Sequence, residues 1–507
     1  MKREEVRQIY LPDLFLGWKL EVWNNTLCRQ KGEKTLPATN DTVGQVSNTM
    51  TLDSLLLNLN DTSWDECVTL DNIATDEDAK KLQAEGYPFV ISQEKFSALL
   101  PEIRPEMVYL SKSFSVSSFY FNPETLAACI LHIAFFSLDD GATYVEQAKR
   151  AIKIREAEVA AGDYKGSVLS LSDGLRMGYF QRLIEKVGSL DGKLYSMFFD
   201  IYVTSDYGFR AIPTEMLETI IASKPESAKE ETRKQVDALP DLVTVYRGGN
   251  TSSTPYTQAW SWSPNINTAH FFAARRGDGP GYVAKGTVHK EDILEAFLDS
   301  TSEPELIIRP GDVKIQEVTT LRGLDEVVDL IKVICVDFQK YSAELDKVTF
   351  QTASNIHDKL HSKRVLIFCL MMAELLQLPS EDVETLAWAA VYHDTRRIND
   401  DAEPGHGKRA ALYYRNHCPG SYDKVTNIII HYHSLGDQKG YEAIAREIQG
   451  QEARERATKL YNIFKDADAL DRQRLGGLRA IDVRMLRNPV AQELTLASRL
   501  IYEQMKD

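Results

Sequence analysis

The sequence predicts a multidomain α+β protein, with a mainly helical N-terminal region, a mixed α/β middle and an all-α C-terminal region. The length of 507 residues corresponds to about three domains of roughly 150 residues each. Short β-branched and aromatic runs between glycines predict a sheet from about residue 195, and helical apolar periodicity follows Pro310. We expect domains at 1–190, 191–320 and 351–507, with a helical linker at 321–350.

Composition and charge exclude several classes of protein. The net charge of -15 disfavours nucleic acid and anionic membranes as partners. The 43% hydrophobic and 26% charged residues are typical of a folded chain, and the six cysteines include no CxxC pair. No apolar stretch reaches the ~20 residues of a membrane span. We expect a cytoplasmic protein in the producing cell, with non-classical delivery into a target cell as the alternative.

The N-terminal region carries no motif with an evident chemistry. Its clearest element is the apolar run Leu126–Phe136, which we expect to be part of a buried helix. His132 lies within this run, and a lone histidine on an apolar face is usually a packed core residue. We therefore expect residues 1–190 to recognise a target.

The middle region places polar residues beside predicted strands, at 242–246, 281–288 and 305–309. Arg247 ends the first strand before two glycines, so its guanidinium could face a phosphate. Ser261 and Ser263 would share one face of a strand, ahead of a short helix at 267–275. Glu303 and Glu305 form a pair that suits oxocarbenium-like chemistry, in which one carboxylate stabilises the cation and the other prepares a nucleophile.

This order of motifs resembles the R-S-E class of mono-ADP-ribosyltransferases of bacteria and phages, over about residues 194–315. The similar segments are VYRGG, AWSWSPN with AHFFA, GYVAKGTVHKEDI and EPELIIRP. The resemblance implies that NAD is a substrate and that a protein, with arginine as the expected residue, accepts ADP-ribose. It assigns Arg247 to an NAD phosphate, Ser261 and Ser263 to the NAD pocket, Glu305 to the oxocarbenium, Glu303 to the acceptor, and Phe271 or Phe272 to the nicotinamide wall.

The C-terminal region gathers histidines and aspartates. Seven of the ten histidines lie between residues 357 and 433, and His393-Asp394 ends a helical run. Imidazole and carboxylate ligands without a nearby thiolate suit Mn, Fe, Ni, Co or Zn. The sequence therefore predicts a site for one or two divalent metal ions.

The segments HSKRVLIF, AAVYHDTRRIND, GHGKRAA and KDADALDRQRL resemble the HD superfamily of metal-dependent phosphohydrolases over about residues 356–497. The resemblance assigns His361, His393, Asp394 and Asp466 to one metal, with Asp394 bridging, and His406 and His433 to a second metal or a phosphate. Asp468 and His431 are the alternatives to Asp466 and His433, because residues two apart on a helix face about 200° apart. We expect His357 and His417 to be surface or packing residues, and Arg396 and Arg397 to form a solvated basic turn or to bind a phosphate.

Together these motifs predict a bifunctional enzyme, an NAD-dependent mono-ADP-ribosyltransferase joined to an HD phosphohydrolase that acts on a nucleotide or another phosphoester. One alternative is an HD nucleotide hydrolase whose transferase-like domain only binds NAD or a partner. A second alternative is a non-catalytic effector or scaffold.

Overall fold

The computed structural model describes residues 64–112, 117–136, 141–188, 193–203, 205, 213–251, 253–275, 280–298, 303–354, 356–401 and 403–505. They fall into two compact units, which divide between residues 234 and 235. The division therefore places residues 191–234, which we expect in the transferase-like domain, with the N-terminal region. Among the described residues, no helix is long and apolar enough to cross a membrane.

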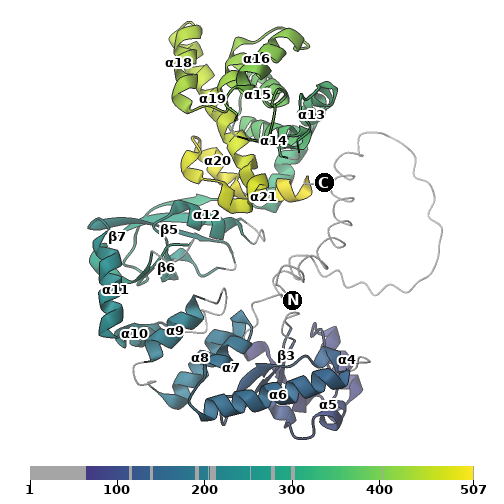
Figure 1. Cartoon of the computed structure of the whole chain (residues 1–507), viewed down its shortest axis with the longest axis vertical. Coiled ribbons are helices and arrows are strands. Elements are labelled where there is room, and N and C mark those ends of the chain that lie inside the picture. The colour runs from purple at the N-terminus through teal and green to yellow at the C-terminus, as the bar shows by residue number, and fades with distance from the viewer. Residues whose placement is uncertain are drawn as a thin grey trace, which may run out of the picture. The chain divides into compact units, whose positions relative to one another are not determined.

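The first unit combines a small antiparallel sheet with helices (Figure 1). The strands run in sequence order, and their bounds are β1 (Val68–Thr69), β2 (Val108–Leu110), β3 (Ser118–Phe121) and β4 (Ala128–Ile130). The helices are α4 (Asp76–Ala84), α5 (Gln93–Leu99), α6 (Gly141–Ala160), α7 (Lys165–Ser170), α8 (Asp173–Val187), α9 (Leu194–Tyr202), α10 (Thr214–Ala222) and α11 (Glu226–Asp237), which ends just beyond the division. The expected target-recognition region, residues 1–190, thus covers this unit only through α8, and residues 1–63 lie outside the description.

The expected helix over Leu126–Phe136 is wrong. The Asn122 side chain accepts the backbone N–H groups of Glu124 and Thr125, which closes a turn, and Leu126 has a φ of 70°. The chain then forms β4, which pairs with β3. His132 is exposed rather than packed in the core. A short apolar run fits a buried strand as well as a buried helix, and strand pairing decides between them here.

The second unit begins with two three-stranded antiparallel sheets, of order β10-β7-β5 and β6-β9-β8. Their bounds are β5 (Leu242–Gly249), β6 (Ser261–Trp262), β7 (Tyr282–His289), β8 (Ile293–Phe297), β9 (Glu305–Ile308) and β10 (Lys314–Thr320). A bridge between Tyr246 and Ser263 joins the sheets, and Trp262 lies in the core beneath them. The strands expected at 242–246, 281–288 and 305–309 are confirmed.

Helix α12 (Ile266–Ala274) connects these sheets to the helices that follow. The side chain of Asn265 caps it, and the helix packs on β5 and β7 (Figure 1). From its other side, Asn267 bonds to Asp482 at 2.9 Å, and the buried His270 lies 3.2 Å from the Thr495 hydroxyl. The sheets and the C-terminal helices therefore form one unit.

The C-terminal helices share one hydrophobic core, with α14 in contact with α13, α15 and α19 (Figure 1). Their bounds are α13 (Leu324–Lys347), α14 (Lys359–Leu375), α15 (Ser380–Tyr392), α16 (His406–His417), α17 (Lys424–Tyr432), α18 (Asp437–Glu447), α19 (Gln451–Leu470), α20 (Pro489–Glu493) and α21 (Thr495–Gln504). Short 3₁₀ helices follow α19 at Asp471–Leu475 (η8), Gly477–Ala480 (η9) and Val483–Met485 (η10). Helix α13 buries Val327, Ile334, Tyr341 and Leu345 in this core, so the segment expected as a linker packs as part of the helical region.

Candidate metal centre

Helix ends bring the predicted ligands together in the helical region. His361 lies in the first turn of α14, where Asp358 caps the helix by accepting the His361 N–H at 2.8 Å. His393 and Asp394 directly follow α15, His406 begins α16, and His433 directly follows α17. All five side chains are buried. The ends of four helices thus bring these five side chains into one buried cluster.

One pair of imidazoles faces the carboxylate of Asp394 from the α14 side. The Nε2 atoms of His361 and His393 lie 3.1 Å apart, and both face Oδ2 of Asp394, at 3.5 and 3.8 Å. Each Nδ1 has an oxygen acceptor, which is Asp471 Oδ2 at 2.7 Å for His361 and the Ala390 carbonyl at 3.0 Å for His393. Because Nδ1–H donates to these oxygens in the neutral ring, both Nε2 atoms carry lone pairs.

A second pair faces the other oxygen of the same carboxylate. The Nε2 atoms of His406 and His433 are 3.0 Å apart and lie 3.2 and 3.4 Å from Asp394 Oδ1. Their Nδ1 atoms contact the carbonyls of Glu403 and Ile430, again leaving the lone pairs on Nε2. Asp394 therefore lies between two imidazole pairs, which is the arrangement expected of a bridging ligand.

This donor set fits divalent cations. Asp394 Oδ1 is buried and finds no hydrogen-bond partner within the described part of the chain, although Arg397 Nη1 forms an ion pair with it at 3.5 Å. The imidazoles around it present lone pairs, and Arg397 reaches one of them, His406 Nε2, at 3.2 Å. Lone pairs about 3 Å apart repel unless a cation lies between them. Adjacent ligands around an ion with bonds of about 2.1 Å are separated by about 3.0–3.4 Å, which matches the two nitrogen pairs.

The protonation states agree with metal binding. Burial lowers the pKa of His361 well below its usual value and that of His393 to about 4, so both rings are neutral at pH 7. Burial opposes ionisation of Asp394, but His393 and the other histidines around the carboxylate hold its pKa well below the usual range. The group thus offers neutral imidazoles and an anionic carboxylate at neutral pH.

The structure separates Asp466 from Asp468. Asp466 is fully buried and accepts the backbone N–H groups of Arg487 and Asn488, with an ion pair to Arg487 at 3.0 Å. These bonds use its carboxylate to anchor the chain after η10. Asp468 lies instead beside the first imidazole pair, with Oδ1 3.5 Å from His361 Nε2. We therefore propose Asp468 as the ligand in place of Asp466.

Some of the remaining candidate residues lie in the cluster and others lie away from it. His433 joins the cluster, whereas the ring of His431 stacks on Tyr432 with centroids 4.1 Å apart. Arg397 Nη1 lies 3.5 Å from Asp394 Oδ1, and Arg396 lies over the ring of Tyr413 instead. His417 is exposed at the end of α16.

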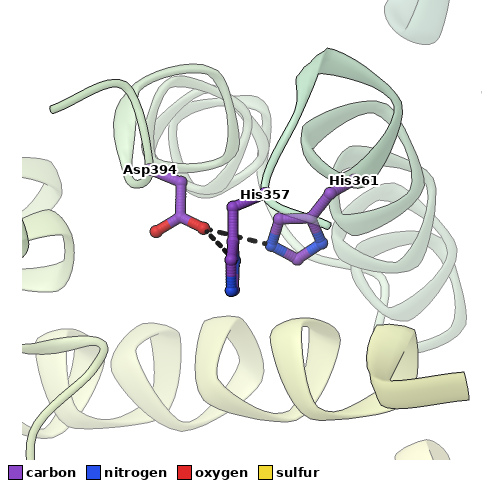
Figure 2. A group of neighbouring side chains, drawn as sticks. All are labelled: His357, His361 and Asp394. Carbon is purple, nitrogen blue, oxygen red and sulfur yellow. Dashed lines mark hydrogen bonds and ion pairs between the residues drawn. The ribbon is translucent and has the colours of Figure 1, made fainter. Parts of the chain in front are cut away.

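His357 is a site residue that the sequence interpretation missed. Its Nδ1 lies 2.8 Å from Asp394 Oδ2, and Figure 2 shows that His357 and His361 approach the same carboxylate oxygen. Two supporting residues, Asp471 and Arg474, were also missed. The available signal was its place four residues before His361, although His357 lies before α14 begins at Lys359.

Contacts also join the three transferase-like motifs. Arg247 Nη1 donates to the Ser261 carbonyl at 2.9 Å, and the Ser261 hydroxyl donates to Glu305. The Ser263 hydroxyl donates to the Pro304 carbonyl at 2.6 Å, inside the E-x-E segment that begins at Glu303. Phe271 and Phe272 are half-buried on α12, with ring centroids 5.5 Å apart. Segments far apart in the sequence thus meet at one place.

Residues 360–473 match the family model described as HD domain. The helical region contains an HD domain. The match includes His361, His393, Asp394, His406, His433 and Asp468, and it supports a divalent metal and a metal-dependent phosphohydrolase. It begins after His357. Comparison with curated proteins and with solved structures gives no significant match, and no comparison supports the predicted transferase.

Proposed function

We propose that the HD domain hydrolyses phosphoesters, with a nucleotide as the expected substrate, using two divalent ions bridged by Asp394. The observation that carries the proposal is the pair of imidazole pairs facing opposite oxygens of one buried carboxylate. His361, His393, Asp394 and Asp468 would hold the first ion, and Asp394, His406 and His433 the second. Such ions supply Lewis acidity towards a phosphoryl group and activate water for attack.

The chain's own residues would orient the ligands and supply positive charge. Asp471 accepts the His361 Nδ1–H and is itself held by Arg364 Nε at 2.6 Å, so the His361 ring is fixed. Arg397 lies at the Asp394 Oδ1 side, and Arg474 lies at the His357 side. Their guanidinium groups would neutralise phosphoryl oxygens that enter between them. Imidazole and carboxylate ligands favour Mn, Fe, Ni, Co or Zn.

The test is hydrolysis by chelator-treated full-length protein reloaded with single metals. The substrates are nucleoside mono-, di- and triphosphates, cyclic dinucleotides and a simple aryl phosphate. We expect metal-dependent release of phosphate or nucleotide by the wild type and by Asp325→Asn, an exposed control on α13. Loss of that activity in Asp394→Asn would support the proposal. Equal activity with and without metal would overturn it.

We propose as a second function that residues 191–320 transfer ADP-ribose from NAD to a protein, with arginine as the acceptor. The contacts among Arg247, Ser261 and Glu305 favour it, because the resemblance requires these residues to meet at one site. Arg247 would bind an NAD phosphate, Ser261 would position Glu305, and Glu305 would stabilise the oxocarbenium. Glu303 would activate the acceptor, and Ser263, Phe271 and Phe272 would line the NAD pocket.

Labelled NAD, incubated with the full-length protein and a cell lysate, tests this function. We expect macromolecular label and free nicotinamide from the wild type and from Glu317→Gln, which changes an exposed residue of β10. Glu305→Gln should abolish both products. If the wild type releases no nicotinamide and labels nothing, the transferase proposal fails, and binding of NAD or a partner is the alternative for this region.

A further inference from the structure

His357 lies at the edge of the metal cluster, before the segment that matches the HD family model. Its side chain is 15% exposed, whereas those of His361 and His393 are fully buried. Its Nδ1 is 2.8 Å from Asp394 Oδ2, and its ring centroid is 5.6 Å from that of His361. Among the three residues drawn in Figure 2, His357 is thus the most exposed.

The backbone before His357 is fixed by two sets of hydrogen bonds. On the N-terminal side, the Ser354 hydroxyl accepts the backbone N–H groups of Ile356 at 3.0 Å and of His357 at 2.7 Å. From η8, Arg474 Nε donates to the Ile356 carbonyl at 3.0 Å. Arg474 and Ile356 are 118 residues apart in the sequence. Together these contacts preorganise the imidazole towards Asp394.

The two polar contacts of His357 Nδ1 call for opposite tautomers, because a bond to Asp394 needs a proton on Nδ1 and a bond from Arg474 needs a lone pair there. Arg474 Nη2 approaches the same nitrogen at 3.4 Å, and arginine can only donate. If Nδ1 accepts from Arg474, it faces the carboxylate lone pair to lone pair at 2.8 Å. A cation beside both atoms removes that conflict, and 2.8 Å is close to the ~3.0 Å separation of two ligands at right angles on one ion.

We propose that His357 Nδ1 is a fifth protein ligand of the ion held by His361, His393, Asp394 and Asp468. This proposal rests on the proposed function, because it requires the same first ion. In a six-coordinate ion, five protein ligands leave one position for water or a phosphoryl oxygen. The second ion has three protein ligands, so the two ions are expected to bind with different affinities, the first more tightly.

The test is calorimetric titration of chelator-treated full-length protein with Mn²⁺. The wild type should take up two ions with distinct affinities. His357→Ala, and His357→Gln as a variant of similar size, should weaken the tighter step at least about tenfold and leave the weaker step in place. His417→Ala removes an exposed histidine from the same domain and should behave as the wild type.

X-ray absorption of protein loaded with one equivalent of Zn²⁺ separates a ligand from a positioning residue. We expect three coordinated imidazoles in the wild type and two in the His357 variants. An unchanged imidazole count, even with weaker binding, would overturn the assignment, because a residue that only positions Asp394 alters no ligand number. If the wild type binds no ion, the proposed function fails as well; if it binds two ions and the His357 variants match it, the His357 assignment alone fails.

Discussion

The second unit contains two polar clusters, one in the HD domain and one in the transferase-like region, and they differ in whether their acceptors have donors within the protein. In the HD domain, acceptors face acceptors, since four imidazole lone pairs surround a carboxylate whose Oδ1 has no hydrogen-bond partner in the described chain and only an ion pair to Arg397 at 3.5 Å. In the transferase-like region, the serine hydroxyls donate to Glu305 and to the Pro304 carbonyl. Acceptors that face one another favour a cation between them, whereas the serine hydroxyls of the other cluster already donate to acceptors within the protein.

In the transferase-like region, the unsatisfied group is a donor, on Arg247. Its Nε is buried and has no hydrogen-bond partner among the residues that the structure describes. An unsatisfied donor favours an anion, just as the unsatisfied acceptor of Asp394 favours a cation. The candidate metal centre thus rests on several converging atoms, whereas the proposed phosphate site rests on one guanidinium and the order of the motifs.

The largest expected effect would break the metal side of this comparison. Asp394→Asn keeps the shape of the side chain but removes the anion between the imidazole pairs. We expect Mn²⁺ affinity to fall at least about a thousandfold, which corresponds to about 4 kcal/mol. Calorimetric titration of the variant beside Asp325→Asn measures the change, and affinity equal to that of the control would refute the bridging role.

The second prediction distinguishes Asp466, which anchors a later segment of the chain, from Asp468, which we propose as a metal ligand. Asp466→Asn weakens the bonds to Arg487 and Asn488 and should lower the free energy of unfolding by about 3 kcal/mol, while the folded protein still binds metal. Asp468→Asn should weaken metal binding and leave the stability of the metal-free protein nearly unchanged. Denaturant unfolding and metal titration of both variants test this pair, and the reverse pattern would restore Asp466 as the ligand.

A smaller effect concerns the contact between α12 and the HD domain. Burial lowers the pKa of His270 to about 4, below the ~6.5 of an unfolded histidine. As pH falls from 7 to 5 the unfolded chain takes up this proton and the folded chain does not, so stability should drop by about 2 kcal/mol from this residue. His270→Gln should lose that part of the pH dependence in urea unfolding, and the exposed His289→Gln should retain it. An identical pH slope in all three proteins would contradict the buried neutral state.

The smallest effect tests whether the two clusters share one rigid unit. Asn267→Ala removes bonds to Asp482 and to the Val483 N–H, both at 2.9 Å, and should cost about 1 kcal/mol. Hydrogen exchange should become faster in both α12 and η10, but not after the same change at the exposed Asn416. Faster exchange confined to α12 would mean that this contact does not hold the two parts together.

Local patterns predicted much of this architecture because the relevant information lies within short segments. The three expected strands and the helix at Leu324–Lys347 follow from residue type and periodicity. Asp466 and Asp468 could not be told apart, because the choice depends on Arg487 and Asn488, which return from a later segment. His357 depends in the same way on the distant Arg474. Tertiary partners, rather than spacing, decide such positions.

The most direct measurement of the central claim is anomalous diffraction from crystals of the Mn²⁺-loaded full-length protein. The account predicts two manganese peaks about 3.5–4 Å apart, on opposite sides of the Asp394 carboxylate. The first should lie among His361, His393 and Asp468, and the second beside His406 and His433. A peak beside Asp466, or a single peak that leaves one imidazole pair without metal, would contradict it.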